Sequence, residues 1–182
     1  SSMKRLKSYL NRSGRFVGER WSQNSNHYNF AYKAYAGYVL SRVNQAPLGA
    51  LRNLYDHQLS WAQSGLPKIH LGLALIKMGD EKRGLESIDK GLNDFPEKRQ
   101  YLGDYGSGIR DMAMSIHLLI ENDVRKKQAF HMSFELAERI KSNRWLSTQE
   151  RNALFLAGIS LGENDNESWL ASLMLEAPNA ET

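Results

Sequence analysis

The stretch Tyr101–Glu121, YLGDYGSGIRDMAMSIHLLIE, contains the loop and the helix on which the predicted fold depends. A glycine-rich, acidic loop leads into a segment whose apolar side chains recur at helical spacing: Ile109, Met112, Ala113, Ile116, Leu119 and Ile120. Ser107 can accept a hydrogen bond from the free amides of the first turn, and Asp111 lies near the positive end of the helix dipole. The pattern predicts a helix that leaves a fixed loop and enters a helical core.

Size and composition indicate a globular domain. The chain has 182 residues, of which 41% are hydrophobic, and this is enough for one domain with its own core. No apolar run approaches the roughly 18 residues that a membrane-spanning helix needs. There are no cysteines, so disulfides, thiolate metal sites and cysteine nucleophiles are excluded within these residues.

The net charge of +4 is unevenly placed. The first twenty residues hold one acid, Glu19, and six bases: Lys4, Arg5, Lys7, Arg12, Arg15 and Arg20. Such a run is compatible with an arm for nucleic acid or a membrane surface, but it is more often a solvated helix face near a chain end. We therefore predict no nucleic-acid partner.

Helical periodicity recurs along most of the chain. It predicts helices over 3–11, 29–43, 48–62, 66–78, 85–95, 109–121, 124–141 and 148–161. Gly79 and Asp80 form a tight turn signal, and Ser147–Glu150 is a capping box. Only Trp169–Leu175 could be either a strand or a helical turn. We predict an all-α fold of paired antiparallel helices over residues 1–162, with residues 163–182 as a linker or tail toward a following domain. Open stacking of the pairs would give a solenoid and closed stacking an α/α toroid, and periodicity does not separate the two.

Three local predictions concern helix faces and caps. An aromatic stripe at helical spacing could stack on a sugar or a base, but helix packing is the favoured interpretation: Tyr28, Ala31, Tyr32, Tyr35 and Val39. In the segment 124–141 we expect Phe130, Phe134, Ala137 and Ile140 to point inward. Asp123 is the expected N-cap of that helix.

No residue is predicted to be catalytic, to bind a cofactor or to hold a metal. The five histidines lack metal-ligand spacing, so we expect surface or boundary positions for them: His27, His57, His70, His117 and His131. Asp104 and Asp111 could form a carboxylate pair of the kind glycosidases use, but hydrogen bonds that fix the loop explain both equally well. Ser107 lacks a nucleophile elbow and a base.

Four segments, in this order, resemble the thioester domain of bacterial alpha-2-macroglobulins. They are Gln45–Leu54 (QAPLGALRNL), Ser64–Gly84 (SGLPKIHLGLALIKMGDEKRG), Gly103–Ser107 followed by Arg110-Asp111, and Arg144–Ala157 (RWLSTQERNALFLA). The resemblance covers most of residues 29–161 and corresponds to the later part of that domain. It implies a complement-like α/α toroid, and so favours the toroid over the solenoid.

The resemblance also implies a function. Members of this family are broad-spectrum endopeptidase inhibitors of the periplasm, often lipoproteins anchored to the inner membrane. A protease cuts a bait region, the inhibitor rearranges, and a thioester in a C-x-E-Q motif becomes available to a protease lysine. The chain contains no C-x-E-Q, so it is either the later half of the thioester domain or part of a family branch without a thioester; the match from mid-domain onward favours the former. We therefore expect a non-enzymatic segment whose partners are proteases, through the full-length protein, and other domains of the same chain. A membrane contact would come only through a lipid anchor outside this segment.

Two other functions remain as alternatives. The first is a helical-repeat interaction scaffold, although no steady repeat of about 34 residues is present. The second is a toroid enzyme, which would need a polar central cavity with paired carboxylates. If the chain is part of a toroid, we expect the Tyr28–Val39 helix to expose its apolar face.

Overall fold

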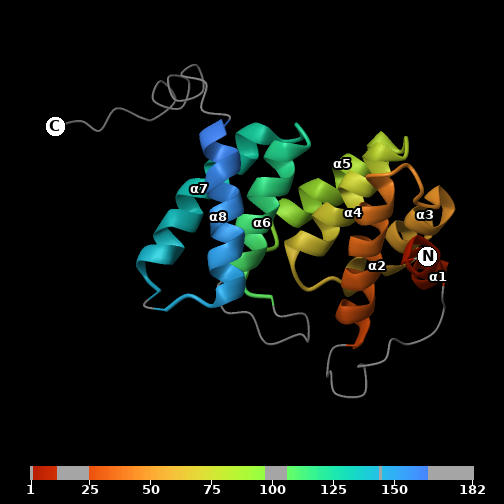
Figure 1. Ribbon diagram of the computed structural model, residues 1–182, viewed down its shortest axis with the longest axis horizontal. Helices are drawn as coiled ribbons and strands as arrows, with labels where there is room; N and C mark the ends of the chain where they lie inside the picture. Colours follow the sequence, from red (N-terminus) through yellow and green to blue (C-terminus); the bar gives the residue numbers. More distant parts are fainter. Residues whose placement is uncertain (1, 12–24, 97–105, 144, 164–182) are drawn as a thin grey trace.

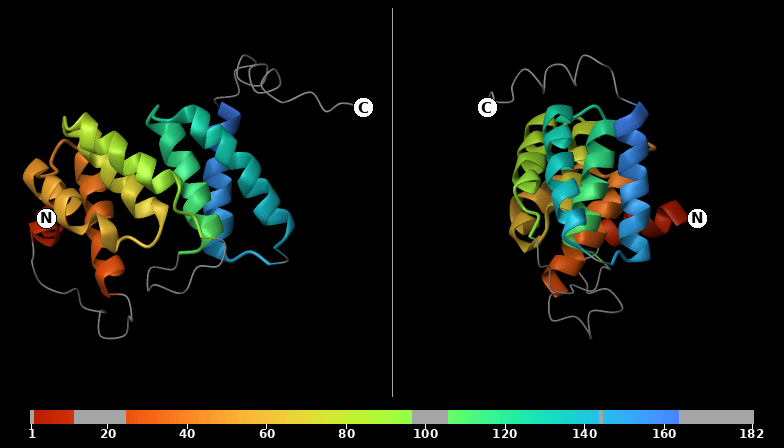
Figure 2. Two further views of the ribbon diagram at one scale, coloured as in Figure 1. Left: turned by 180° about the vertical axis from the view of Figure 1, so that it is seen from behind. Right: turned by 90° about the vertical axis from the view of Figure 1, so that its left-hand side faces the viewer.

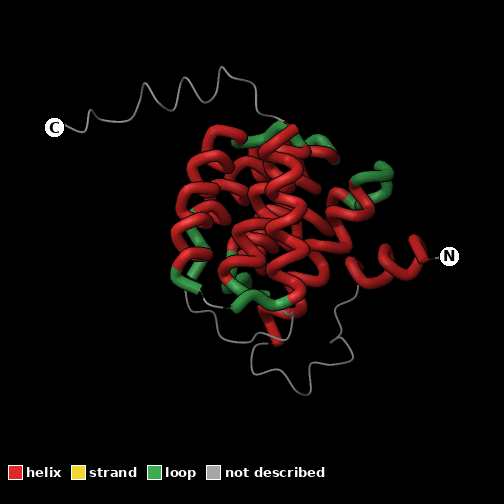
Figure 3. Tube along the Cα trace, turned by 60° about the vertical axis from the view of Figure 1, so that its left-hand side comes forward, coloured by secondary structure: helices red, strands yellow, loops and turns green. Residues whose placement is uncertain are grey.

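The computed structural model describes residues 2–11, 25–96, 106–143 and 145–163, and all regular structure in these ranges is helical (Figure 3). The elements are α1 (Ser2–Asn11), α2 (Ser25–Ser41), α3 (Leu48–Gln58), the 3-10 turn η2 (Leu59–Trp61), α4 (Gly65–Lys77), α5 (Glu81–Leu92), α6 (Gly108–Glu121), α7 (Lys126–Lys141) and α8 (Thr148–Glu163). The all-α prediction is confirmed. The predictions for Trp169–Leu175 and for the tail beyond Glu163 fall outside the described residues.

The helices form two layers. In the first layer α2, α4, α6 and α8 follow one another across the molecule, each in contact with the next (Figure 1). In the second layer α3 packs on α2 and α4, α5 packs on α4, and α7 packs on α6 (Figure 2). We call these the inner and the outer layer. Each outer helix follows its inner neighbour along the chain, which is the paired arrangement that the sequence predicts.

Helix α4 connects the two hydrophobic cores. Leu71, Ala74 and Leu75 pack with α1, α2 and α3. Leu66, Ile69 and Leu73 pack with α5, α6, α7 and α8. A helix that is apolar around most of its circumference is buried on more than one side, as the sequence of this segment predicts.

Glycines allow α4 and α5 to approach closely. Gly65 and Gly72 of α4 lie opposite Gly91 and Gly84 of α5. A Cβ added at Gly72 would lie 2.6 Å from the carbonyl oxygen of Gly84, and a Cβ at Gly65 would lie 2.1 Å from that of Gly91. The two backbones therefore touch directly, which sequence periodicity does not predict.

The predicted turn signals are confirmed at several positions. Gly79 has φ +92°, in the left-handed region, and the carboxylate of Asp80 accepts from the Arg83 amide at the start of α5. The Asp123 prediction is wrong: α7 begins at Lys126, and its N-cap position is Arg125 in a left-handed conformation. Asp123 also has φ +57°, outside the extended range in which an N-cap side chain reaches back to the first turn.

The predicted inward face of α7 is also wrong in part. The buried residues are Ala129, Met132 and Leu136, whereas Phe134 is 58% exposed and Ala137 is also exposed. Both sets satisfy a period of 3.6 residues, so periodicity alone does not choose between them. The face that packs against α6 carries the fully buried Ala129, and a small residue there is compatible with close helix packing.

Candidate functional site

The loop-to-helix motif around Ser107 forms a cluster of helix caps. The Ser107 hydroxyl accepts from the Arg110 amide at 3.1 Å, and it donates to Glu150 Oε1 at 2.6 Å. The other oxygen of Glu150 accepts from the Ser147 amide at 2.7 Å, and Ser147 in turn caps the amide of Glu150. The predicted capping box is confirmed, and its carboxylate also holds the hydroxyl that caps α6. One side chain thus ties the N-terminal ends of α6 and α8 together.

Burial and hydrogen bonding have opposite effects on the pKa of Glu150. Burial alone would raise the pKa of this carboxyl, but the hydrogen bonds from Ser107 and Ser147 outweigh that effect and hold the pKa below its ordinary value. The carboxylate is therefore ionised at neutral pH, close to the positive ends of two helix dipoles. Its role is structural.

Asp111 is buried in the same region, with 1% of its surface exposed, and its Oδ1 accepts from Nε and Nη2 of Arg110 at 2.8 and 2.5 Å. Asp104, the other candidate of the predicted carboxylate pair, lies outside the described residues. In the described part of the motif, Asp111 therefore pairs with the preceding residue of the same helix.

The histidines occupy separate positions. His27 is fully buried, and its Nδ1 accepts a hydrogen bond from the Gln63 amide at 2.9 Å. His117 Nδ1 lies 2.7 Å from Ser160 Oγ of α8. His57 and His131 are exposed. The expectation of surface or boundary positions is therefore wrong for His27 and for His70, which is 8% exposed. Within the described ranges no three histidine or acidic side chains gather as a metal site would require.

His70 lies at the wall of a cavity between three inner helices. The cavity has a volume of about 350 Å³ and is lined by residues of α2, α4 and α6: Ala31, Tyr32, Tyr35, Leu66, Pro67, His70, Arg110 and Met114. We call it the α2–α4–α6 cavity. Its rim is aromatic, since Tyr32 is 42% and Tyr35 is 53% exposed. The predicted packing of the Tyr28–Val39 stripe is therefore wrong for these two rings, whereas the expected exposure of this helix face is confirmed.

The polar groups of this cavity are already engaged or neutral. The His70 ring makes an edge contact with Tyr35 at 5.3 Å and a tilted contact with Tyr38 at 5.4 Å between ring centroids. Burial, with a smaller contribution from the positive charge of Arg110, lowers the pKa of His70 to about 3. The imidazole is therefore neutral at physiological pH, and the Arg110 guanidinium is paired with Asp111. The cavity can accommodate an uncharged apolar group, and no nucleophile with an adjacent base lines it.

Sequence reasoning missed this cavity, although it identified some of its parts. The tyrosine stripe was visible as a pattern, and His70 lies at the border of the apolar face of its helix. The sequence did not reveal that α2 and α6 lie on either side of α4. This arrangement brings the tyrosines of α2, His70 of α4 and Arg110 of α6 to one cavity. Arg110 would have been the useful signal, because it is a basic residue directly before a buried acid on a mostly apolar helix.

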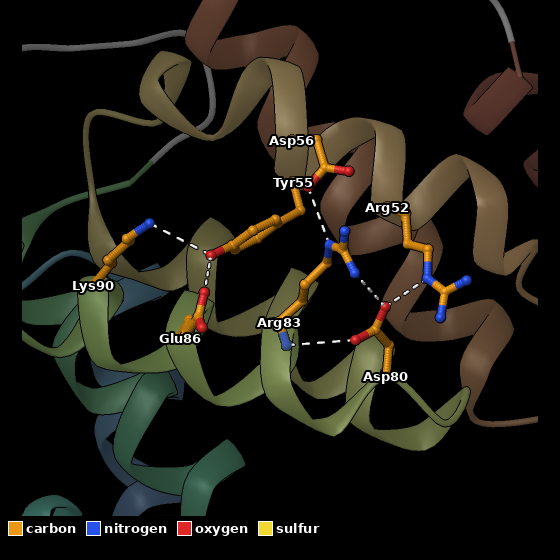
Figure 4. Close-up of polar contacts among 7 residues, drawn as sticks. All are labelled: Arg52, Tyr55, Asp56, Asp80, Arg83, Glu86 and Lys90. Carbon is orange, nitrogen blue, oxygen red and sulfur yellow. Dashed lines mark hydrogen bonds and ion pairs between the residues drawn. The ribbon is translucent and has the colours of Figure 1, made fainter.

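A polar network joins the outer helices α3 and α5 (Figure 4). Its centre is Asp80, whose carboxylate accepts from Arg52 Nε at 2.5 Å and from Arg83 Nη1 at 3.3 Å. Arg83 also donates through Nε to Asp56 at 3.0 Å. The hydrogen bond from Arg52 is the main reason that the pKa of Asp80 lies below its usual value. In this network Arg52 and Arg83 are paired with the carboxylates of Asp80 and Asp56.

Tyr55 extends the same network along α5. Its hydroxyl donates to Glu86 Oε2 at 2.6 Å, and Lys90 Nζ lies 3.5 Å from the phenolic oxygen and above the ring (Figure 4). Burial, together with the hydrogen bond to Glu86, raises the pKa of Tyr55 to about 12. The phenol is therefore a neutral donor, and its role here is to hold α3 against α5.

Comparison with known proteins gives a consistent result. No family model matches the chain. The alpha-2-macroglobulin of Escherichia coli K12 is 43% identical over 155 residues, which cover 84% of this chain and 9% of that protein. The crystal structure of Salmonella alpha-2-macroglobulin reacted with methylamine is 45% identical over 87% of this chain and 10% of that one, with a TM-score of 0.81. The chain belongs to the bacterial alpha-2-macroglobulins.

Two Escherichia coli structures extend this comparison to different states of an alpha-2-macroglobulin. The native form, spanning domain MG7 to the C-terminus, is 40% identical with a TM-score of 0.83, over 89% of this chain and 25% of that one. The trypsin-activated form is 41% identical with a TM-score of 0.80, over 88% of this chain and 11% of that one. This alpha-2-macroglobulin chain spans less than a tenth of the curated relative from Escherichia coli K12. Its cap cluster, cavity and polar network therefore lie in a chain that aligns with only a small part of each of these relatives.

Proposed function

We propose that this chain is a non-catalytic helical part of the thioester domain of a bacterial alpha-2-macroglobulin. The complete protein would be a broad-spectrum endopeptidase inhibitor that traps proteases after they cleave its bait region. This is supported by the Escherichia coli alpha-2-macroglobulin, of which one solved structure was activated by trypsin and another by porcine elastase. Proteases are therefore the proposed partners of the complete protein, and its other domains are the proposed partners of this chain.

One observation carries the proposal. The fold of this chain matches native and trypsin-activated forms of the Escherichia coli protein about equally well, with TM-scores of 0.83 and 0.80. A similar match to both states supports a helical segment whose fold changes little between them. We infer that it acts as a rigid body that supports reactive chemistry located elsewhere in the domain.

The location of the complete protein is part of the proposal. Resemblance to the family supports the periplasm, with anchoring to the inner membrane as a lipoprotein. No helix in the described ranges has both the length and the apolar character needed to cross a bilayer. We propose that the lipid anchor belongs to another part of the complete protein.

Trapping by the complete protein is the test of the proposed function. After incubation with trypsin, cleavage of a large protein substrate should fall while cleavage of a small chromogenic peptide persists, because a trapped protease is shielded sterically. Trypsin with a blocked active site is the control, since it cannot cut a bait region. Full cleavage of the large substrate by the mixture would contradict the proposal.

The isolated chain provides a second test. Because it contains no cysteine, it cannot form the family's thioester by itself. We expect no inhibition of trypsin and no covalent adduct. An adduct between the chain and trypsin that survives boiling in detergent would show that the reactive group lies within these residues.

A further inference from the structure

We draw no further inference here: the strongest candidate, the exposed apolar face of α8 around Phe155, Gly158 and Ile159, carries none, because nothing in the part of the chain that the structure describes shows what covers it.

Discussion

The glycine contact between α4 and α5 leads to the sharpest prediction. Gly72 lies in the middle of α4, directly against α5. A Cβ placed there would lie 2.5 Å from Ile88 Cγ1, 2.6 Å from the Gly84 oxygen and 3.1 Å from the Ile88 nitrogen. The first of these atoms belongs to a side chain that can turn away. The other two belong to the backbone of α5, so the whole helix must move.

The magnitude follows from two opposing effects. Replacing glycine by alanine inside a helix stabilises it by about 0.5–1 kcal/mol, because alanine loses less backbone freedom on folding. Overpacking in a closely packed core costs about 1–3 kcal/mol, and contact with an immobile backbone puts this site at the upper end. We therefore expect Gly72→Ala to lower the free energy of unfolding by about 2 kcal/mol, or roughly 4–8 °C in Tm for a domain of this size.

The matched control is Gly158→Ala in α8. Gly158 is also in the interior of a helix, but no atom lies within 4 Å of its added Cβ. Only the gain in helix propensity applies, so this variant should be more stable than the wild type by about 0.5–1 kcal/mol. Urea unfolding followed by circular dichroism measures both variants. If Gly72→Ala proved as stable as Gly158→Ala, the close backbone contact between α4 and α5 could not be present.

Three further predictions concern single side chains. The folded state holds His70 neutral with a pKa of about 3, against 6.5 in an unfolded chain, so the unfolded state binds more protons as the pH falls below 6.5. The free energy of unfolding of the wild type should therefore be about 2 kcal/mol lower at pH 5 than at pH 7.5. Urea unfolding at the two pH values should show a difference that is smaller by about this amount for His70→Gln. Glu150→Gln should lower the free energy of unfolding by about 1–2 kcal/mol at pH 7, since the Ser107 and backbone hydrogen bonds lose a charged acceptor. The ionised carboxylate stabilises the fold above pH 4.5, so this difference should shrink as the pH is lowered below that value. In α7, Met132→Ala should cost about 2–3 kcal/mol and Phe134→Ala less than about 0.5, and equal costs in thermal unfolding would contradict the observed buried face.

The local signals of the sequence were sufficient for much of the fold. Ser107, Asp80 and the Ser147–Glu150 box each have a side chain whose chemistry specifies a helix start, and each caps a helix as predicted. Such signals involve residues within four positions of one another, so they do not depend on how distant segments pack. The failure at Asp123 shows the limit, because the same residue type serves equally well in a left-handed turn.

Helix faces were less predictable, since they depend on the neighbours of each helix. In α7 the phenylalanines suggested an inward face that the packing against α6 does not use. In α2 the tyrosine stripe was a real feature, but its exposed state depends on which other helices are present. The glycines of α4 and α5 were visible individually. Their pairing needed the antiparallel register of the two helices, which no single segment contains.

Exposed ion pairs and buried contacts both join helices in this molecule, but they differ in how much they stabilise the fold. The α3–α5 network is built from side chains such as Arg83 and Asp56 that are more than a third exposed, and ion pairs of this type contribute little and are screened by salt. The α4–α5 backbone contact and the Glu150 cap are instead buried, and neither can be lost without a large penalty. Local opening would therefore break the α3–α5 ion pairs before it separates α4 from α5 or α6 from α8. Leu51 and Leu54 still hold α3 in the core. On this argument the buried contacts, rather than the ion pairs, hold the helices together as one rigid body, and the α2–α4–α6 cavity lies within it.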